Sequence, residues 1–219
     1  SQNQSDATDS LKAQQPPAKP STPTLAPKGT GGIEVTWDAG TPVPAGGEVG
    51  AFEIWVQSPA DIGTWVKVPA DKLSCSPTVA SPCTITGLPV GDPIKVIVKA
   101  VNDAGTTASD ASAEATPVTA PTAPTGVEVA QTAGTPDSLV VSWTDLPAGE
   151  ADSYTVYISE NEDGPFTTAA TCVAGGQTPA TSPCQIDGLT AGTTYYVQVS
   201  GTKSGVEGAN SGTQSAMAI

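Results

Sequence analysis

The stretch ASPCTITGL at residues 80–88 occurs a second time, in diverged form, as TSPCQIDGL at residues 181–189. The second copy begins 101 residues after the first, and at the same spacing Trp65 corresponds to Phe166. A repeat of about 100 residues has the length of a single small domain. The sequence therefore predicts two diverged copies of one fold.

Apolar and polar residues alternate with a period of two through both copies. In the first copy Ile33 and Val35 alternate up to Trp37, and in the second Leu139 and Val141 alternate up to Trp143. The same alternation runs through residues 52–56, 94–101, 154–158 and 195–199. This period indicates strands with one face inside, so we expect Trp37 and Trp143 in the core.

The composition favours short strands joined by turns, because the chain has 23 Gly and 21 Pro and only 5% aromatic residues. Turn sequences separate the alternating segments, for example at residues 102–105 and 189–192. We therefore predict an all-β fold: two tandem β-sandwiches, each of seven strands, with a short Pro-rich linker.

The ordered set of motifs resembles the fibronectin type III family. In the second copy it comprises residues 121–129, the strand that ends in Trp143, the Tyr154 strand and residues 188–199. Within the last segment, Tyr195 matches the family's buried corner tyrosine. The resemblance implies an immunoglobulin-like sandwich with a spacer, scaffold or binding role and no catalytic residues.

The first copy is similar but departs from the family pattern at Ile94, where the corner tyrosine is expected. The corner hydrogen bond should therefore be missing there, which predicts a less stable corner in the first copy. The resemblance covers roughly residues 21–219.

The expected organisation has four parts. Residues 1–20 form an extended tail of low hydrophobicity, and Leu11, its only large apolar residue, is the candidate anchor for assembly. The first domain takes residues 21–117 and the second residues 125–219. Residues 118–124 form a semi-rigid linker between them.

Four cysteines are divided evenly between the copies. Their number and placement predict the disulfides Cys75–Cys83 and Cys172–Cys184, each stabilising by about 2–3 kcal/mol. The alternatives are disulfides between subunits and a four-cysteine zinc site, which would require closer spacing. Disulfides imply an oxidising compartment, so we expect a secreted protein at the cell surface, with residues 1–4 as the mature end after removal of a leader.

The charge and residue types exclude several classes of function. The net charge is −14, from 22 acidic and eight basic residues, so we expect no nucleic-acid partner. No apolar run is long enough for membrane insertion. The sequence has no His and no Arg, so the commonest general base, metal ligand and phosphate clamp are missing. We expect no enzyme, no cofactor and no metal; the acidic turn at residues 160–164 is interpreted as a hairpin turn rather than a calcium site.

Several aromatic residues fall on outward strand positions. Trp55 is out of phase with the core residues of its strand, and family topology places Trp65 and Ile97 beside it. The equivalent residues of the second copy are Tyr157, Phe166 and Tyr196. Such a face either shields the sheet by cross-strand packing or forms a contact surface for another molecule.

Two functions fit these features. The first is a structural subunit of an extracellular filament, pilus-like fibre or surface layer of a prokaryote, whose partners are copies of itself or other surface proteins. The alternative is an adhesin or a carbohydrate-binding accessory module of a secreted polysaccharide-degrading enzyme, with the aromatic residues stacked on sugar rings.

Overall fold

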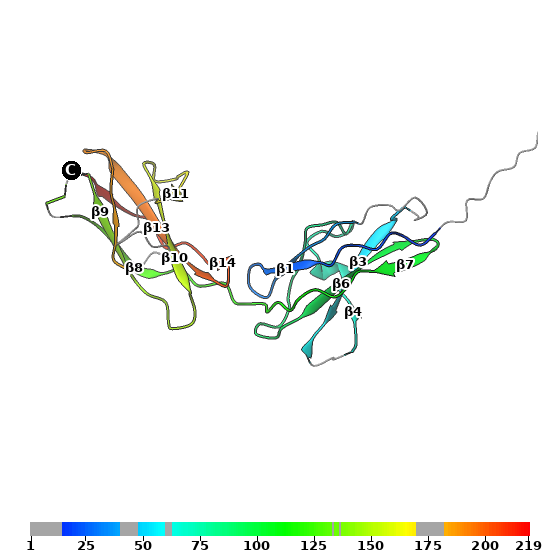
Figure 1. The fold of residues 1–219 in the computed structure, drawn as a ribbon. Coiled ribbons are helices and arrows are strands. Elements are labelled where there is room, and N and C mark those ends of the chain that lie inside the picture. The colour runs from blue at the N-terminus through cyan, green and yellow to red at the C-terminus, as the bar shows by residue number, and fades with distance from the viewer. Residues whose placement is uncertain (1–14, 40–47, 60–62, 133, 136, 170–181) are drawn as a thin grey trace, which may run out of the picture. The chain divides into compact units, whose positions relative to one another are not determined.

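The computed structural model describes residues 15–39, 48–59, 63–132, 134–135, 137–169 and 182–219. Its strands fall into two groups that share no hydrogen-bonded ladder, β1–β7 and β8–β15 (Figure 1). One turn of 3₁₀ helix lies at Ala70–Lys72. Within the described ranges, no helix is long and apolar enough to span a membrane. The predicted all-β fold is confirmed.

The first sandwich pairs a three-stranded sheet, β1-β2-β5, with a four-stranded sheet, β4-β3-β6-β7. Its strands are β1 (Thr24–Pro27), β2 (Ile33–Thr36), β3 (Ala51–Gln57), β4 (Val66–Lys67), β5 (Cys83–Ile85), β6 (Lys95–Asn102) and β7 (Gly105–Ala108). Trp37 follows β2 and meets Phe52 of β3 edge to face, with the ring centroids 5.7 Å apart. This aromatic pair joins the two sheets across the core.

The second sandwich repeats this arrangement with β8-β9-β12 against β11-β10-β13-β14, and β15 also pairs with β13. Its strands are β8 (Thr125–Gln131), β9 (Leu139–Thr144), β10 (Ser153–Ser159), β11 (Thr167–Thr168), β12 (Cys184–Ile186), β13 (Thr194–Lys203), β14 (Val206–Glu207) and β15 (Gln214–Met217). The rings of Trp143 and Tyr154 join its two sheets, with their centroids 5.5 Å apart.

Both cores consist of the alternating residues that the sequence indicates. Trp37 is 4% exposed and Trp143 is 6% exposed, so the prediction that both are core residues is confirmed. The remaining fully buried side chains are mostly β-branched or leucine: Ile33, Val35, Ile54, Ile85, Val96 and Val98 in the first sandwich, and Leu139, Val141, Val156, Val197 and Val199 in the second. These shapes suit a pleated surface covered on one side.

The repeated Ser-Pro-Cys motif holds the sheet edge next to each core tryptophan. The Ser81 hydroxyl accepts a hydrogen bond from the backbone N–H of Trp37 at 2.9 Å. Ser182 accepts the same bond from Trp143, also at 2.9 Å, and donates one back to the Trp143 carbonyl. The motif recurs because it supplies a partner to backbone groups beyond the end of the strand ladder.

The end of the expected tail lies against the first sandwich. Pro17, Ala18 and Pro20 are buried, and Lys19 forms an ion pair with Asp110 at 2.8 Å. Residues 15–20 are therefore in contact with the sandwich, while Leu11 and the rest of residues 1–14 lie outside the described residues.

Candidate interaction surfaces

The outward face of the sheet β4-β3-β6-β7 carries Trp55, as its position out of phase with Ile54 predicted. The strand register places Trp55 directly opposite Ile97 of β6 on one side and Lys67 of β4 on the other. Trp55 is half-buried, whereas Ile97 is only 8% exposed. Ile97 therefore lies covered beside Trp55 and offers little surface of its own.

Charged side chains surround the Trp55 ring. The Lys99 ammonium lies 3.5 Å from the ring centroid, which is a cation–π contact. The indole Nε1–H donates to Glu53 at 3.0 Å, and Glu53 also accepts from Lys67 at 2.6 Å. The hydrogen bond from Lys67 is the main reason why the pKa of Glu53 lies below its ordinary value of 4.5. Trp55 is thus engaged by Lys99 and Glu53 of the same face, and Lys67 in turn holds Glu53.

Trp65 stands two residues before Lys67, just outside β4, and is half-buried. Since alternate residues of an extended chain point to the same side, Trp65 belongs to the face that carries Lys67 and Trp55. The surface is therefore a mixture of two indole rings and an ionic cluster.

The equivalent face of the second sandwich is polar. Tyr157 of β10 pairs with Gln198 of β13, and its hydroxyl donates to Glu207 of β14. Glu207 also accepts from the Ser200 hydroxyl at 2.6 Å. Because the neutral phenol is the donor to Glu207, the pKa of Tyr157 is raised above its ordinary value of 10.0.

Two other predicted residues of this face are only partly covered. Tyr196 lies opposite Ser159 and Ser215 in the register, and Phe166 directly precedes β11. Both are half-buried. The hairpin turn expected at residues 160–164 connects β10 to β11, with Gly164 N–H bonded to the Asn161 carbonyl at 3.0 Å.

The sequence did not identify the polar partners on these faces. Glu53 and Lys99 share the alternation of Trp55 and could have been found from it once the pairing of β3 with β6 was known. Glu207 could not, because its place beside Tyr157 depends on the hairpin that joins β13 to β14.

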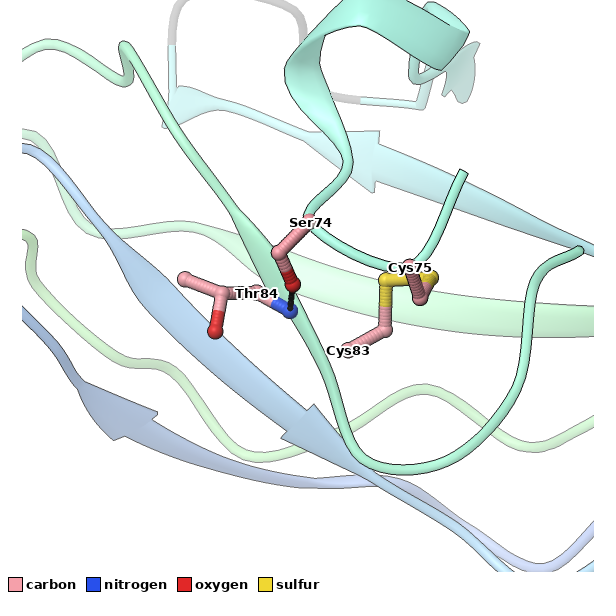
Figure 2. Close-up of a disulfide and its surroundings, with 4 residues drawn as sticks. All are labelled: Ser74, Cys75, Cys83 and Thr84. Carbon is pink, nitrogen blue, oxygen red and sulfur yellow. Dashed lines mark hydrogen bonds between the residues drawn. A yellow bond between two sulfur atoms is a disulfide. The ribbon is translucent and has the colours of Figure 1, made fainter. Parts of the chain in front are cut away.

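The predicted disulfide Cys75–Cys83 is present, with Cα atoms 5.3 Å apart (Figure 2). Next to it the Thr84 N–H donates to the Ser74 hydroxyl and the Ser74 N–H donates to the Thr84 carbonyl, each over 2.9 Å. Cys184 is also disulfide-bonded, while its predicted partner Cys172 lies outside the described residues.

The corner tyrosine of the second sandwich makes the hydrogen bond that the resemblance implied. The Tyr195 hydroxyl accepts from the Thr190 N–H at 3.0 Å and donates to Glu160 at 3.3 Å. In the first sandwich the corresponding Ile94 is 3% exposed and packs as an ordinary core residue.

No cluster of three or more Cys, Asp or Glu side chains that would suit a metal ion occurs among the residues the structure describes. On the two faces, the acidic groups of Glu53 and Glu207 are instead bonded to Trp55, Lys67, Tyr157 and Ser200.

Residues 122–216 match the fibronectin type III domain family. The chain contains a fibronectin type III domain. Among solved structures, the FN1–FN3 domains of chicken CNTN1 are similar, with a TM-score of 0.66 and 18% identity over 94% of this chain and 68% of that one. At this identity the likeness shows the fold alone, which is that of tandem fibronectin type III domains. No curated protein matches the sequence.

This fold and the disulfide are features of extracellular proteins generally. The first sandwich shares the strand order of the fibronectin type III domain at residues 122–216, with its Trp37 and Phe52 in the places of Trp143 and Tyr154.

Proposed function

We propose that this protein is a non-catalytic structural subunit of an extracellular, cell-surface filament, pilus-like fibre or layer. Copies of the chain would assemble through the tail around Leu11 and through the sheet faces that carry Trp55, Trp65, Tyr157, Phe166 and Tyr196. The observation that carries the proposal is that the polar groups on both faces are bonded within their own domain. Such side chains stabilise a sheet surface.

The same observation favours assembly over carbohydrate binding. A sugar ring stacks on an open aromatic face, but the Lys99 ammonium lies over the ring of Trp55. The Tyr157 hydroxyl is likewise engaged by Glu207. A flat protein surface can pack on these groups as they stand, whereas a stacked sugar would first have to displace Lys99.

The charge predicts how assembly should respond to salt. Copies with a net charge of −14 repel one another, and this repulsion is screened over about 10 Å at 0.1 M salt. Assembly should therefore be weak at low ionic strength and stronger at physiological or higher ionic strength.

Sedimentation velocity and negative-stain electron microscopy of the full chain, from low to high salt and protein concentration, test the proposal. We expect concentration-dependent polymers whose formation is reduced by Trp65→Ser and unaffected by Val90→Ser, which changes an apolar loop residue that is 48% exposed. A chain that stays monomeric throughout overturns the proposal. Retention on insoluble polysaccharides, lost in Trp65→Ser, would support the carbohydrate-binding alternative instead.

A further inference from the structure

An apolar groove lies at one end of the first sandwich, between the start of β3 and the loop closed by the disulfide. Residues 49–52 form one wall and residues 77–80 the other, around a volume of about 380 Å³. No lining residue is charged, and Val49, Phe52 and Val79 are each half-buried. The groove is therefore suited to an apolar side chain.

Both walls are held in place by covalent or backbone contacts. The loop that contains residues 77–80 is closed by Cys75–Cys83 and by the paired backbones of Ser74 and Thr84. On the other wall, Gly50 N–H bonds to the Val101 carbonyl at 2.9 Å. The walls of the groove are thus fixed by contacts within the sandwich, which reduces the ordering cost of filling it.

The described chain begins beside this groove. The Asn102 side-chain amide donates to the Gln15 carbonyl at 2.9 Å and to the Glu48 carbonyl at 3.1 Å. Gln15 therefore lies near Glu48, the neighbour of Val49 in the groove wall. Fourteen residues precede Gln15, and Leu11 is their only large apolar residue.

The spacing is sufficient for Leu11 to reach the groove of its own chain. Four residues of extended chain span at most about 13–14 Å, and Gln15 is held at the groove's edge. A tether this short gives an effective concentration in the millimolar range, well above that of a second copy in dilute solution.

We propose that the segment around Leu11 docks in this groove of its own chain, with the leucine side chain between Phe52 and Val79. The inference goes beyond the proposed assembly function, because it concerns one chain in dilute solution. Assembly through the tail would then require the Leu11 segment to leave this groove at the higher concentrations at which copies polymerise. The same contact exchanged between two copies would be a domain swap, which is a different outcome.

Amide NMR spectra of the full ¹⁵N-labelled chain test the docking. Leu11→Ser is expected to shift amide resonances of residues 49–52 and 77–80, whereas Ala7→Ser, a matched change in the same tail, should leave them unchanged. In the reverse direction, Val79→Ser should shift the tail resonances near Leu11, and Val66→Ser, a solvent-facing valine that is 51% exposed, should not. Leu11→Ser replaces a tail residue, so its effect on the groove does not depend on any change to the sandwich.

A mixing experiment distinguishes docking of the tail within one chain from docking of the tail of a second copy. Labelled Leu11→Ser chain is combined with unlabelled native chain at low concentration. Groove resonances that stay unchanged on mixing support docking within one chain, while resonances that return toward their native positions show docking between copies and overturn the proposal. An absence of any shift at residues 49–52 and 77–80 in Leu11→Ser also overturns it, whatever the microscopy of polymers shows.

Discussion

The corners of the two sandwiches show how one fold tolerates the loss of a family hydrogen bond. In the second sandwich Tyr195 accepts from the Thr190 N–H. In the first sandwich Ile94 replaces the tyrosine, and the residue equivalent to Thr190 is Pro89, which has no N–H to donate. Acceptor and donor are both missing, so the substitution leaves no unpaired donor at this corner.

The joint loss of the acceptor and the donor changes the expectation that the first corner is less stable. Removing one partner of a hydrogen bond leaves the other without its bond, whereas removing both can be nearly neutral. Ile94 gains full burial in the core, and its backbone pairs with Ala115 in both directions at 2.8 and 3.0 Å.

The outward faces differ in a similar way. The first sandwich covers Trp55 with an ionic cluster, and the second ties Tyr157 to Glu207 and Ser200 without any lysine. The difference follows composition, because residues 21–120 have five lysines against ten acidic residues, whereas residues 121–219 have one lysine against ten. One scaffold thus carries two chemically different surfaces.

The largest expected contrast between the sandwiches comes from removing the bridge of the first one. Cys75→Ser combined with Cys83→Ser should lower the free energy of unfolding of that sandwich by about 2–3 kcal/mol, because the unfolded loop is no longer constrained. Hydrogen exchange, measured separately on peptides from each sandwich in increasing denaturant, gives the free energy of unfolding of each one. Peptides from residues 137–169 are the internal control, and an equal loss there would contradict a local role for the bridge.

The corner comparison can be tested by exchanging the residues. Tyr195→Phe should destabilise the second sandwich by about 1–2 kcal/mol, because two hydrogen bonds of the hydroxyl are lost. Ile94→Tyr in the first sandwich should give no gain, since Pro89 offers no donor and the core there is already filled. Thermal and chemical denaturation measure both variants.

The double variant Pro89→Thr with Ile94→Tyr sharpens this test. It should be more stable than Ile94→Tyr alone by about 1 kcal/mol, which is the value of one restored hydrogen bond. If Ile94→Tyr by itself stabilised the first sandwich, the explanation based on the missing donor would be wrong.

The serine hydrogen bonds should matter in both sandwiches. Ser81→Ala and Ser182→Ala each remove the acceptor for a tryptophan backbone N–H, with an expected cost of about 1 kcal/mol, and Ser182→Ala also removes the bond to the Trp143 carbonyl. Equilibrium denaturation of the two variants provides the comparison, with Ser76→Ala, an exposed serine of the same loop as Ser81, as the control. A cost in only one sandwich would show that the repeated motif has different roles.

The smallest expected effect is an opposite response to pH. The pKa of Glu53 is lowered in the folded state by Lys67, so its stabilisation is present above pH 4.5 and lost as the pH falls through the lowered pKa. The loss should be less than about 1 kcal/mol, because the Lys67 side chain is 55% exposed and solvent screens the pair. Chemical denaturation between pH 3 and pH 7 should show this loss of stability at low pH in the native chain and not in Glu53→Gln.

The second sandwich should respond at the alkaline end. The pKa of Tyr157 is raised in the folded state, so its stabilisation is present below pH 10 and lost as the pH rises through the raised pKa. Ultraviolet titration of tyrosine, compared with Tyr157→Phe, reports this ionisation. A phenol that ionises at its ordinary pKa would show that the bond to Glu207 is not maintained in solution.

Much of the architecture was determined by local sequence. Alternation with period two decides which side chains a sheet can bury, and it correctly placed Trp37, Trp143 and Trp55. The repeated Ser-Pro-Cys stretch identified two domains, and the position of Cys75 and Cys83 in one copy predicted their disulfide. These features depend on neighbours along the chain, so they are readable from the order of the residues.

The partners across strands were decided only by the tertiary structure. Lys99 over Trp55, Glu207 beside Tyr157, and the two walls of the groove at residues 49–52 and 77–80 each join segments that are far apart in the sequence. Alternation states which face a residue occupies, but strand register and loop closure determine which residue lies opposite it. For this reason the sequence predicted two sandwiches with aromatic faces, and only the folded chain showed that Trp55 and Tyr157 are already bonded to neighbours of their own face.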